Sequence, residues 1–138
     1  MSYPPQKLFE KYIMRKIAKT GNSGEKLAAE YLRKHGFIIS QRNFHSRFGE
    51  IDIIAENEQY ILFVEVKTRK VGAKVSPAES VDIHKQRKIV STAKVYMMKS
   101  YCTLQPRFDV AEIEVSELAG REEYKINYIE NAFVPEGF

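Results

Sequence analysis

Residues 49–69 read GEIDIIAENEQYILFVEVKTR, and this stretch decides the fold. Two apolar runs rich in Ile, Val and Phe flank the polar residues ENEQ, a pattern that predicts an antiparallel hairpin. The same runs contain Asp52, Glu65 and Lys67. Because burying an unpaired charge is expensive, these three side chains either neutralise one another or bind something.

The register of the hairpin places the three charges. If the chain turns in the middle of ENEQ, Asp52 pairs with Phe63 and Glu50 pairs with Glu65. Directly opposite residues share a face of a sheet, and so do residues two apart. We therefore expect Asp52, Glu65 and Lys67 on one face, with the two carboxylates diagonal to each other and about 7–8 Å apart at the backbone. A loop one residue longer or shorter would separate them.

Two carboxylates that face each other repel unless a positive charge lies between them. Mg²⁺ prefers oxygen ligands and commonly binds one or two carboxylates together with water and phosphate. Asp52, Glu65 and the nearby Lys67 therefore fit a site for phosphodiester hydrolysis that uses Mg²⁺ or Mn²⁺. The alternative is a structural ion-pair cluster or a solvated sheet face. The sequence has no zinc-type Cys/His cluster, Gly-rich phosphate loop or nucleophilic serine motif.

Length and composition indicate one globular domain. The chain has 138 residues, 43% hydrophobic and 12% aromatic, which is enough for one core. Its single cysteine, Cys102, excludes an internal disulfide. The start MSYPPQK has no apolar segment of the kind found in secretion signals, and no stretch is apolar enough to span a bilayer. We expect a cytoplasmic protein without a membrane partner.

Charge is unevenly distributed along the chain. Residues 1–20 carry a net charge of +4, residues 67–108 carry +8, and residues 109–138 carry −6. The basic central segment indicates a polyanionic partner such as nucleic acid. A solvated, lysine-rich helix face explains the same charges equally well.

The remaining pattern gives the expected element order α-α-β-β-β-α-β-β. Helical spacing of apolar residues predicts a basic N-terminal helical extension within residues 1–20, followed by a single domain over 21–138. Residues 22–25 can form a capping box, and Gly36 is placed to end the second helix. The other expected elements are a strand over 37–44, a helix starting at Ser76 and continuing to about residue 100 with an alternative break near 83, and strands over 107–115 and 124–133.

The motifs GEIDII and EVKTR resemble the PD-(D/E)XK nuclease superfamily, in particular archaeal Holliday junction resolvases. A wider set, GEKLAAEYLRKHGF, RNFHSRFGEIDIIA, FVEVKTR, SPAESVDIHKQRKI and RFDV, is similar to the bacterial YraN-like family and covers about residues 21–115. The resemblance implies an α/β, restriction-endonuclease-like fold, with a mixed central β-sheet flanked by helices.

The resemblance also implies roles for individual residues. Asp52 and Glu65 match the metal-binding acids of the superfamily, Lys67 matches its catalytic lysine, and Glu25 matches an acid that many members carry on the first helix. Glu25 has the alternative role of a capping residue. The superfamily's proline is replaced here by Ile51, as in many resolvase-like members.

Several side chains are expected to contact nucleic acid around the mouth of the site. These are Arg47, Arg69, Lys85, Gln86 and Lys88, together with Arg42, Lys70 and Lys74. For Lys85 and Gln86, a solvated helix face is the alternative. Phe44, His45 and Phe48 can stack on an unpaired base or simply pack beside the core.

The predicted function is that of a metal-dependent endonuclease acting on DNA rather than RNA, at branched or junction structures. A homodimer follows by analogy with resolvases, which cut two strands. The main alternative is a non-catalytic nucleic-acid-binding module that retains the nuclease fold. A third hypothesis is a protein-interaction domain that docks through the acidic C-terminal third.

Overall fold

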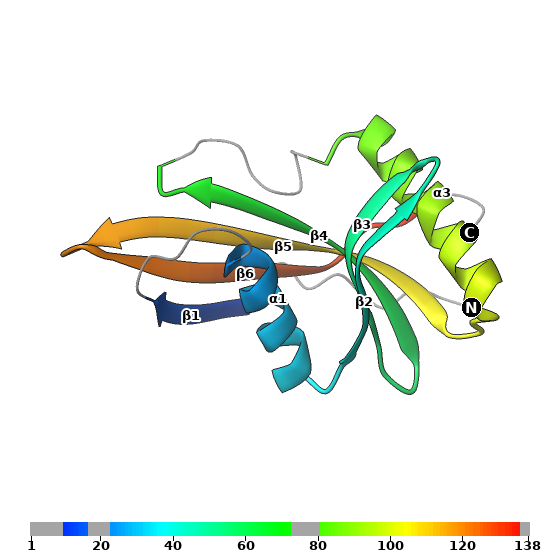
Figure 1. Cartoon of the computed structure of the whole chain (residues 1–138), viewed down its shortest axis with the longest axis horizontal. Helices are drawn as coiled ribbons and strands as arrows, with labels where there is room; N and C mark the ends of the chain where they lie inside the picture. Colours follow the sequence, from blue (N-terminus) through cyan, green and yellow to red (C-terminus); the bar gives the residue numbers. More distant parts are fainter. Residues whose placement is uncertain (1–9, 17–22, 73–80, 136–138) are drawn as a thin grey trace.

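The computed structural model describes residues 10–16, 23–72 and 81–135 (Figure 1). Over these ranges the chain forms one six-stranded sheet in the order β1-β6-β5-β4-β3-β2, together with two helices. Only β4 and β5 are parallel, so the sheet is mixed. The predicted α/β class is confirmed, and the architecture is consistent with a restriction-endonuclease-like fold. The elements are β1 (Glu10–Lys16), α1 (Ser23–Lys34), β2 (Ile38–Ser46), β3 (Gly49–Glu56), β4 (Tyr60–Lys70), α3 (Ile83–Ser100), β5 (Gln105–Leu118) and β6 (Arg121–Phe133).

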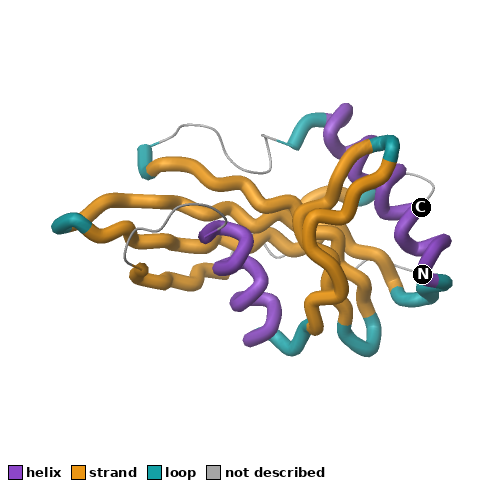
Figure 2. The backbone as a smooth tube through the Cα atoms, in the orientation of Figure 1, coloured by secondary structure: helices purple, strands orange, loops and turns teal. Residues whose placement is uncertain are grey.

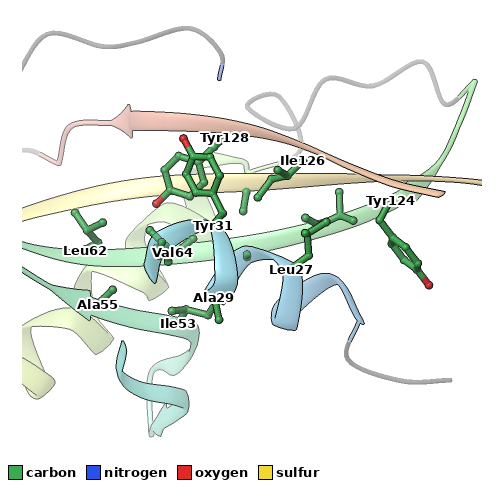
Figure 3. Packing of buried hydrophobic residues seen from close by; sticks show 14 residues of the cluster. Leu27, Ala29, Tyr31, Ile53, Ala55, Leu62, Val64, Tyr124, Ile126 and Tyr128 are labelled. Carbon is green, nitrogen blue, oxygen red and sulfur yellow. The ribbon is translucent and has the colours of Figure 1, made fainter. Parts of the chain in front are cut away.

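Each face of the sheet has its own hydrophobic core. Leu62 and Val64 of β4 pack with α1, whereas Ile61 and Phe63, which alternate with them, pack with α3. Figure 3 shows the α1 side, where Leu27 and other residues of the helix point toward the strands. Figure 2 shows the second helix, α3, at the opposite end of the sheet from the long β5–β6 hairpin. The two helices therefore cover different faces of the sheet.

The centre of the sheet explains why the hairpin sequence is so apolar. Residues 61–65 of β4 are all buried because β4 lies between β3 and β5 and is covered on both faces. A strand buried on both faces has a nearly continuous apolar sequence instead of an alternating one. Glu65 is the last residue of this buried run, and it is 7% exposed.

The end of α1 confirms the role predicted for Gly36. Gly36 has φ +87°, and its N–H donates to the Arg33 carbonyl, while the Phe37 N–H donates to the Leu32 carbonyl at 3.0 Å. These two bonds form a Schellman motif, which requires a left-handed residue where Gly36 lies. The Asn22 part of the expected capping box lies outside the described residues.

The helix that precedes β5, α3, begins at Ile83, where the sequence analysis placed an alternative break. Its described part starts at Ile83, where the Asp82 side chain accepts a hydrogen bond from the Lys85 N–H at 2.9 Å. Asp82 is therefore the N-cap of α3 and satisfies one of the free N–H groups of the first turn. The start expected at Ser76 lies in residues 73–80, which the structure does not describe.

The prediction of a helix in the N-terminal region is wrong for residues 10–16. These residues form β1, which pairs antiparallel with β6 from Glu10 opposite Tyr128 to Lys16 opposite Glu122. A short apolar run does not distinguish helix from strand by periodicity. The edge of β6 decides the outcome, because its unpaired N–H and C=O groups are a template for another strand. The segment expected to be a helical extension thus contributes a strand to the central sheet.

The other strands lie where the sequence predicted them, but the hairpin register differs. Ile53 pairs with Val64 and Glu56 pairs with Ile61, a shift of two residues from the expected pairing. The cause is a turn of the expected length that lies one residue later in the chain: the Asn57 N–H donates to the Tyr60 carbonyl, and the Asn57 Oδ1 accepts hydrogen bonds from the N–H groups of residues 59 and 60. Because the shift is two residues rather than one, the paired residues from Ile53 to Glu56 keep their predicted faces.

Candidate active site

The charged residues gather where β3 separates from β4. The last recorded pair of this ladder is Ile53 with Val64. At the next step the Asp52 Oδ2 accepts a hydrogen bond from the Val66 N–H at 2.8 Å, in place of a backbone carbonyl. Ile51 and Ile53 belong to cores on opposite faces of the sheet, so the regular alternation of β3 is interrupted at Asp52. The described β3–β4 ladder therefore does not include Asp52, which reaches β4 through its side chain.

Glu65 is the centre of a carboxylate–lysine cluster. Its Oε1 lies 3.5 Å from the Lys67 Nζ and 3.4 Å from the Lys85 Nζ. Lys67 reaches it along β4, and Lys85 reaches it from the first turns of α3. The lysine side chains remain 35% and 36% exposed. The two lysine side chains of the cluster are therefore accessible to solvent, whereas the Glu65 carboxylate is buried.

Glu25 approaches from α1. Its helix begins close against the sheet at Gly24, where a Cβ atom would lie 2.5 Å from the Thr68 Oγ1. The Glu25 Oε1 lies 3.8 Å from the Arg42 Nη2. This oxygen and the Arg42 Nε are buried and have no hydrogen-bond partner in the described part of the chain. Arg42 was expected to contact nucleic acid, and the structure gives it a carboxylate neighbour instead.

The electrostatics confirm that the acids are close together. Burial raises the pKa of Asp52, against the opposing effect of the Val66 N–H. Burial also raises the pKa of Glu65, and the Asp52 charge raises it further, while Lys85 and Lys67 oppose the shift. The pKa of Glu25 is raised by burial and then by Asp52. A carboxylate that raises the pKa values of neighbouring acids, as Asp52 does here, is typical of functional sites, although structural clusters show the same effect.

The donor set fits an open cation site better than a closed one. Within the described ranges, no group of three or more His, Cys, Asp or Glu side chains is arranged to hold a metal. Asp52 and Glu65 offer carboxylate oxygens, although Asp52 already uses one of them to accept from Val66. Mg²⁺ commonly takes one or two protein carboxylates and completes its shell with water and phosphate. The residues present fit that mode of binding.

The residues predicted to contact nucleic acid fall into two groups. Arg47 and Lys88 are exposed, and Lys85 lies at the carboxylate cluster. Gln86 instead donates to the Val81 carbonyl at 3.0 Å, and Arg69 forms an ion pair with the buried Glu112. The sequence analysis did not single out Glu112, although it lies opposite Lys67 in the β4–β5 register. Only the knowledge that β4 and β5 are adjacent could have identified it.

A second buried cluster, which the sequence analysis did not predict, supports the strands behind the site. Asp109, next to Val64 in the β4–β5 register, accepts from the Arg107 Nε and Nη2 at 3.0 and 2.8 Å. It also accepts from the Tyr128 hydroxyl at 2.6 Å and from the Asn131 N–H at 2.8 Å. Burial and the Asp109 charge raise the pKa of Tyr128 well above its ordinary value. The cluster therefore links β5 to β6 through a fully buried charge pair.

Fold and site together define an α/β protein with a restriction-endonuclease-like sheet and a carboxylate–lysine cluster at the fork between two strands. Uncharacterised protein family UPF0102 matches residues 24–113, a range that includes Glu25, Asp52, Glu65 and Lys67. The chain belongs to this family, which is the YraN-like family that the motifs indicated. No described helix has the length and hydrophobicity needed to cross a membrane.

The similarity to relatives covers nearly the whole chain. A UPF0102 protein of Caldanaerobacter subterraneus subsp. tengcongensis is 46% identical over 123 residues, which are 87% of this chain and 100% of the relative. A UPF0102 protein of Clostridium acetobutylicum is 45% identical over 116 residues, 83% of this chain and 93% of the relative. A third, from Clostridium botulinum strain Loch Maree, is 43% identical over 115 residues, covering 82% and 92%.

Proposed function

We propose that the protein is a metal-dependent endonuclease that hydrolyses phosphodiester bonds in DNA, including branched DNA. The proposal rests on the convergence of Asp52, Glu65, Lys67 and Lys85 at the fork between β3 and β4. A buried carboxylate and a half-buried one beside two solvent-facing ammonium groups suit a site that must hold a cation and a phosphate together.

The side chains would divide the work by position. Bound between Asp52 and Glu65, Mg²⁺ or Mn²⁺ would polarise the phosphate and lower the pKa of a water molecule. Lys67, now 3.5 Å from the Glu65 Oε1, is close enough to shift toward a phosphate oxygen and neutralise charge that develops there. Lys85 offers a second ammonium group from α3 and fixes the orientation of the scissile phosphate. Glu25 offers a buried oxygen that can accept a proton from water.

A cleavage assay tests the proposal. Purified wild-type protein is incubated with branched DNA and Mg²⁺ or Mn²⁺, in parallel with Asp52→Asn and Lys67→Met. We expect each substitution to lower the cleavage rate by about 100-fold or more, the size typical for removal of one group that stabilises transition-state charge. Glu114→Gln, which alters an ion pair with Lys125 that is about one-third exposed, is the matched control and should cut at the wild-type rate. Cutting that persists unchanged in both site variants would come from a contaminant and would refute the assignment.

A non-catalytic nucleic-acid-binding module is the second candidate. Glu65 is already neutralised by Lys67 and Lys85, and the described residues provide no third acidic ligand arranged for a metal. This hypothesis predicts salt-dependent DNA binding without cleavage under any divalent metal. Binding that is unaffected by Mg²⁺ and equally strong in Asp52→Asn would favour it.

An endonuclease that cuts both strands of a junction needs two sites, so the proposal extends to a homodimer on DNA. Sedimentation of the protein with a four-way junction measures the stoichiometry. Two copies per junction would support the extension, and one copy would restrict the proposal to single-strand cutting.

A further inference from the structure

The tip of the β2–β3 hairpin carries an exposed aromatic–cationic pair. Ser46 pairs with Gly49, so Arg47 and Phe48 form a two-residue turn between the strands. Phe48 is 41% exposed, and the Arg47 guanidinium lies 4.8 Å from the centroid of its ring. Phe48 belongs to neither hydrophobic core of the described structure.

Phe44, on the same hairpin, is packed against the protein and so contrasts with Phe48. Phe44 lies against the α3-side core, with its ring centroid 5.1 Å from that of Tyr96. Nearby, the His45 Nδ1 lies 3.3 Å from Glu50. Both residues were candidates for stacking on a base, and both have protein partners. His45 is also exposed, at 68% of its side chain, but it is paired with Glu50; Phe48 is the candidate that presents an apolar ring to solvent.

The tip is held firmly in place. The Phe48 N–H donates to the Ser46 Oγ at 3.1 Å, and the Ser46 Oγ is hydrogen-bonded to the Thr92 Oγ1 of α3 at 3.0 Å. Thr92 is fully buried. Gly49 packs so closely on α3 that a Cβ atom there would lie 3.4 Å from the Lys88 Cβ. Figure 1 shows this end of the hairpin against α3. The aromatic pair is therefore preorganised rather than on a free loop.

The tip and the carboxylate cluster are joined by a basic path. Lys88 lies beside the tip, and Lys85, three residues earlier on the same helix face, contacts Glu65. Along β3, four residues separate Phe48 from Asp52, which is a span of about 13 Å at the rise of a strand. Stacked base pairs rise about 3.4 Å each, so this span equals about four base pairs.

We propose that Phe48, backed by Arg47, is a stacking platform for an unpaired base, so that the protein binds DNA at the boundary between a duplex and a single strand. The inference rests on the endonuclease proposal and names its substrate class. Base stacking on an aromatic ring is sequence-tolerant, and an arginine on the ring adds a cation–π contribution. With the unpaired base on Phe48 and the phosphate backbone along Lys88 and Lys85, the scissile bond lies about four nucleotides from the boundary.

A binding experiment without metal tests the platform independently of cleavage. The probe is a flapped duplex with 2-aminopurine as its first unpaired base, compared with a fully paired duplex of equal length, in EDTA. We expect the wild type to quench the 2-aminopurine fluorescence on binding and to prefer the flapped duplex. Phe48→Leu, which keeps the apolar bulk but removes the ring, should lose the quenching and weaken flap binding by roughly fivefold to 150-fold. Phe48→Trp should retain both.

The outcomes separate this inference from the proposed function. If flapped DNA is bound and cut but Phe48→Leu leaves quenching and preference unchanged, the platform is wrong and the endonuclease assignment stands. If the flap is bound with quenching that depends on Phe48, and nothing is cut under any metal, the platform stands as a binding site and the endonuclease assignment fails. If no DNA is bound at low salt, both fail. Because Phe48 is outside both cores, a melting temperature that matches the wild type verifies that the variants fold.

Discussion

Asp109→Asn gives the most direct test of how the strands behind the site are held together. Asp109 accepts three hydrogen bonds from Arg107, two of them shared by the Nε–H, as well as one from the Tyr128 hydroxyl and one from the Asn131 N–H. The Asp109 and Arg107 side chains are 0% and 6% exposed. Asparagine preserves the shape and some of the hydrogen bonds, but among the described residues it leaves the guanidinium with only Glu130, at 3.9 Å, as a charged partner.

The burial of the Arg107–Asp109 pair sets the size of the expected loss of stability. Removing one partner of a buried ion pair costs about 3–5 kcal/mol, and Glu130 nearby favours the lower end of that range. For a chain of 138 residues, the entropy of unfolding is about 290 cal/mol/K near the melting temperature. A loss of about 3 kcal/mol therefore lowers the melting temperature by about 10 °C, out of a total stability of about 5–15 kcal/mol.

Thermal unfolding followed by circular dichroism, together with urea titration, measures the effect. Glu114→Gln is the matched control, because its ion pair with Lys125 is 3.8 Å long and about one-third exposed. Exposed pairs contribute about 0–1 kcal/mol, so the control should shift the melting temperature by no more than about 3 °C. Equal shifts for Asp109→Asn and Glu114→Gln would refute the argument that the buried cluster holds β5 to β6.

Three further predictions concern the site, a turn and the basic path. Burial raises the pKa of Glu65 above its ordinary 4.5, so the neutral carboxyl stabilises the fold fully below pH 4.5, and this stabilisation is lost as the pH rises through the pKa of the folded state. The free energy of unfolding of Glu65→Gln should therefore exceed that of the wild type increasingly toward neutral pH. Melting measured over a range of pH that shows no such difference contradicts the prediction. Gly36→Ala places a side chain at φ +87° and should cost about 1–2 kcal/mol by urea titration, with Gly36→Asn costing less; a neutral Gly36→Ala would argue against the left-handed turn. If Lys88 contacts a phosphate, Lys88→Ala should reduce the slope of log affinity against log salt concentration by about 0.9 on duplex DNA. Lys99→Ala, at the far end of α3, is the control and should leave the slope unchanged. A slope for Lys88→Ala equal to that of the wild type would remove Lys88 from the basic path.

Local patterns predicted most strands and the end of one helix. The two apolar runs around ENEQ located β3 and β4, and Gly36 marked the end of α1, because these features depend on neighbouring residues in the sequence. The N-terminal strand β1 was missed for the opposite reason. Residues 10–16 have no strong local preference, and only the edge of β6, more than 100 residues away, selects a strand.

The candidate site was predictable in composition but not in detail. Asp52, Glu65 and Lys67 stand out because charges interrupt apolar strands, and Asp52 still reaches β4, through the Val66 N–H, although the predicted register was wrong by two residues. The contacts of Lys85 with Glu65 and of Arg42 with Glu25 join distant segments. No periodicity in one sequence encodes such contacts, since they depend on how α3 and α1 cross the sheet.

The fork between β3 and β4 explains why an aspartate is placed inside an apolar strand. Where β3 leaves β4, the Val66 N–H loses its carbonyl partner, and an unpaired buried N–H costs about 1–3 kcal/mol. Asp52 supplies the missing acceptor and, in doing so, brings a second carboxylate beside Glu65. A residue that completes the sheet thus also creates the repulsion that a cation would relieve. Asp52→Ala would therefore lose the hydrogen bond to the Val66 N–H as well as any catalytic role of the carboxylate. Asp52→Asn keeps an oxygen that can accept from the Val66 N–H, so it tests the effect of removing the negative charge alone. Lys67 is 35% exposed, and replacing it leaves no backbone group of the β3–β4 ladder without a partner. The cleavage rate of a Lys67 variant therefore reports on catalysis more directly than that of an Asp52 variant.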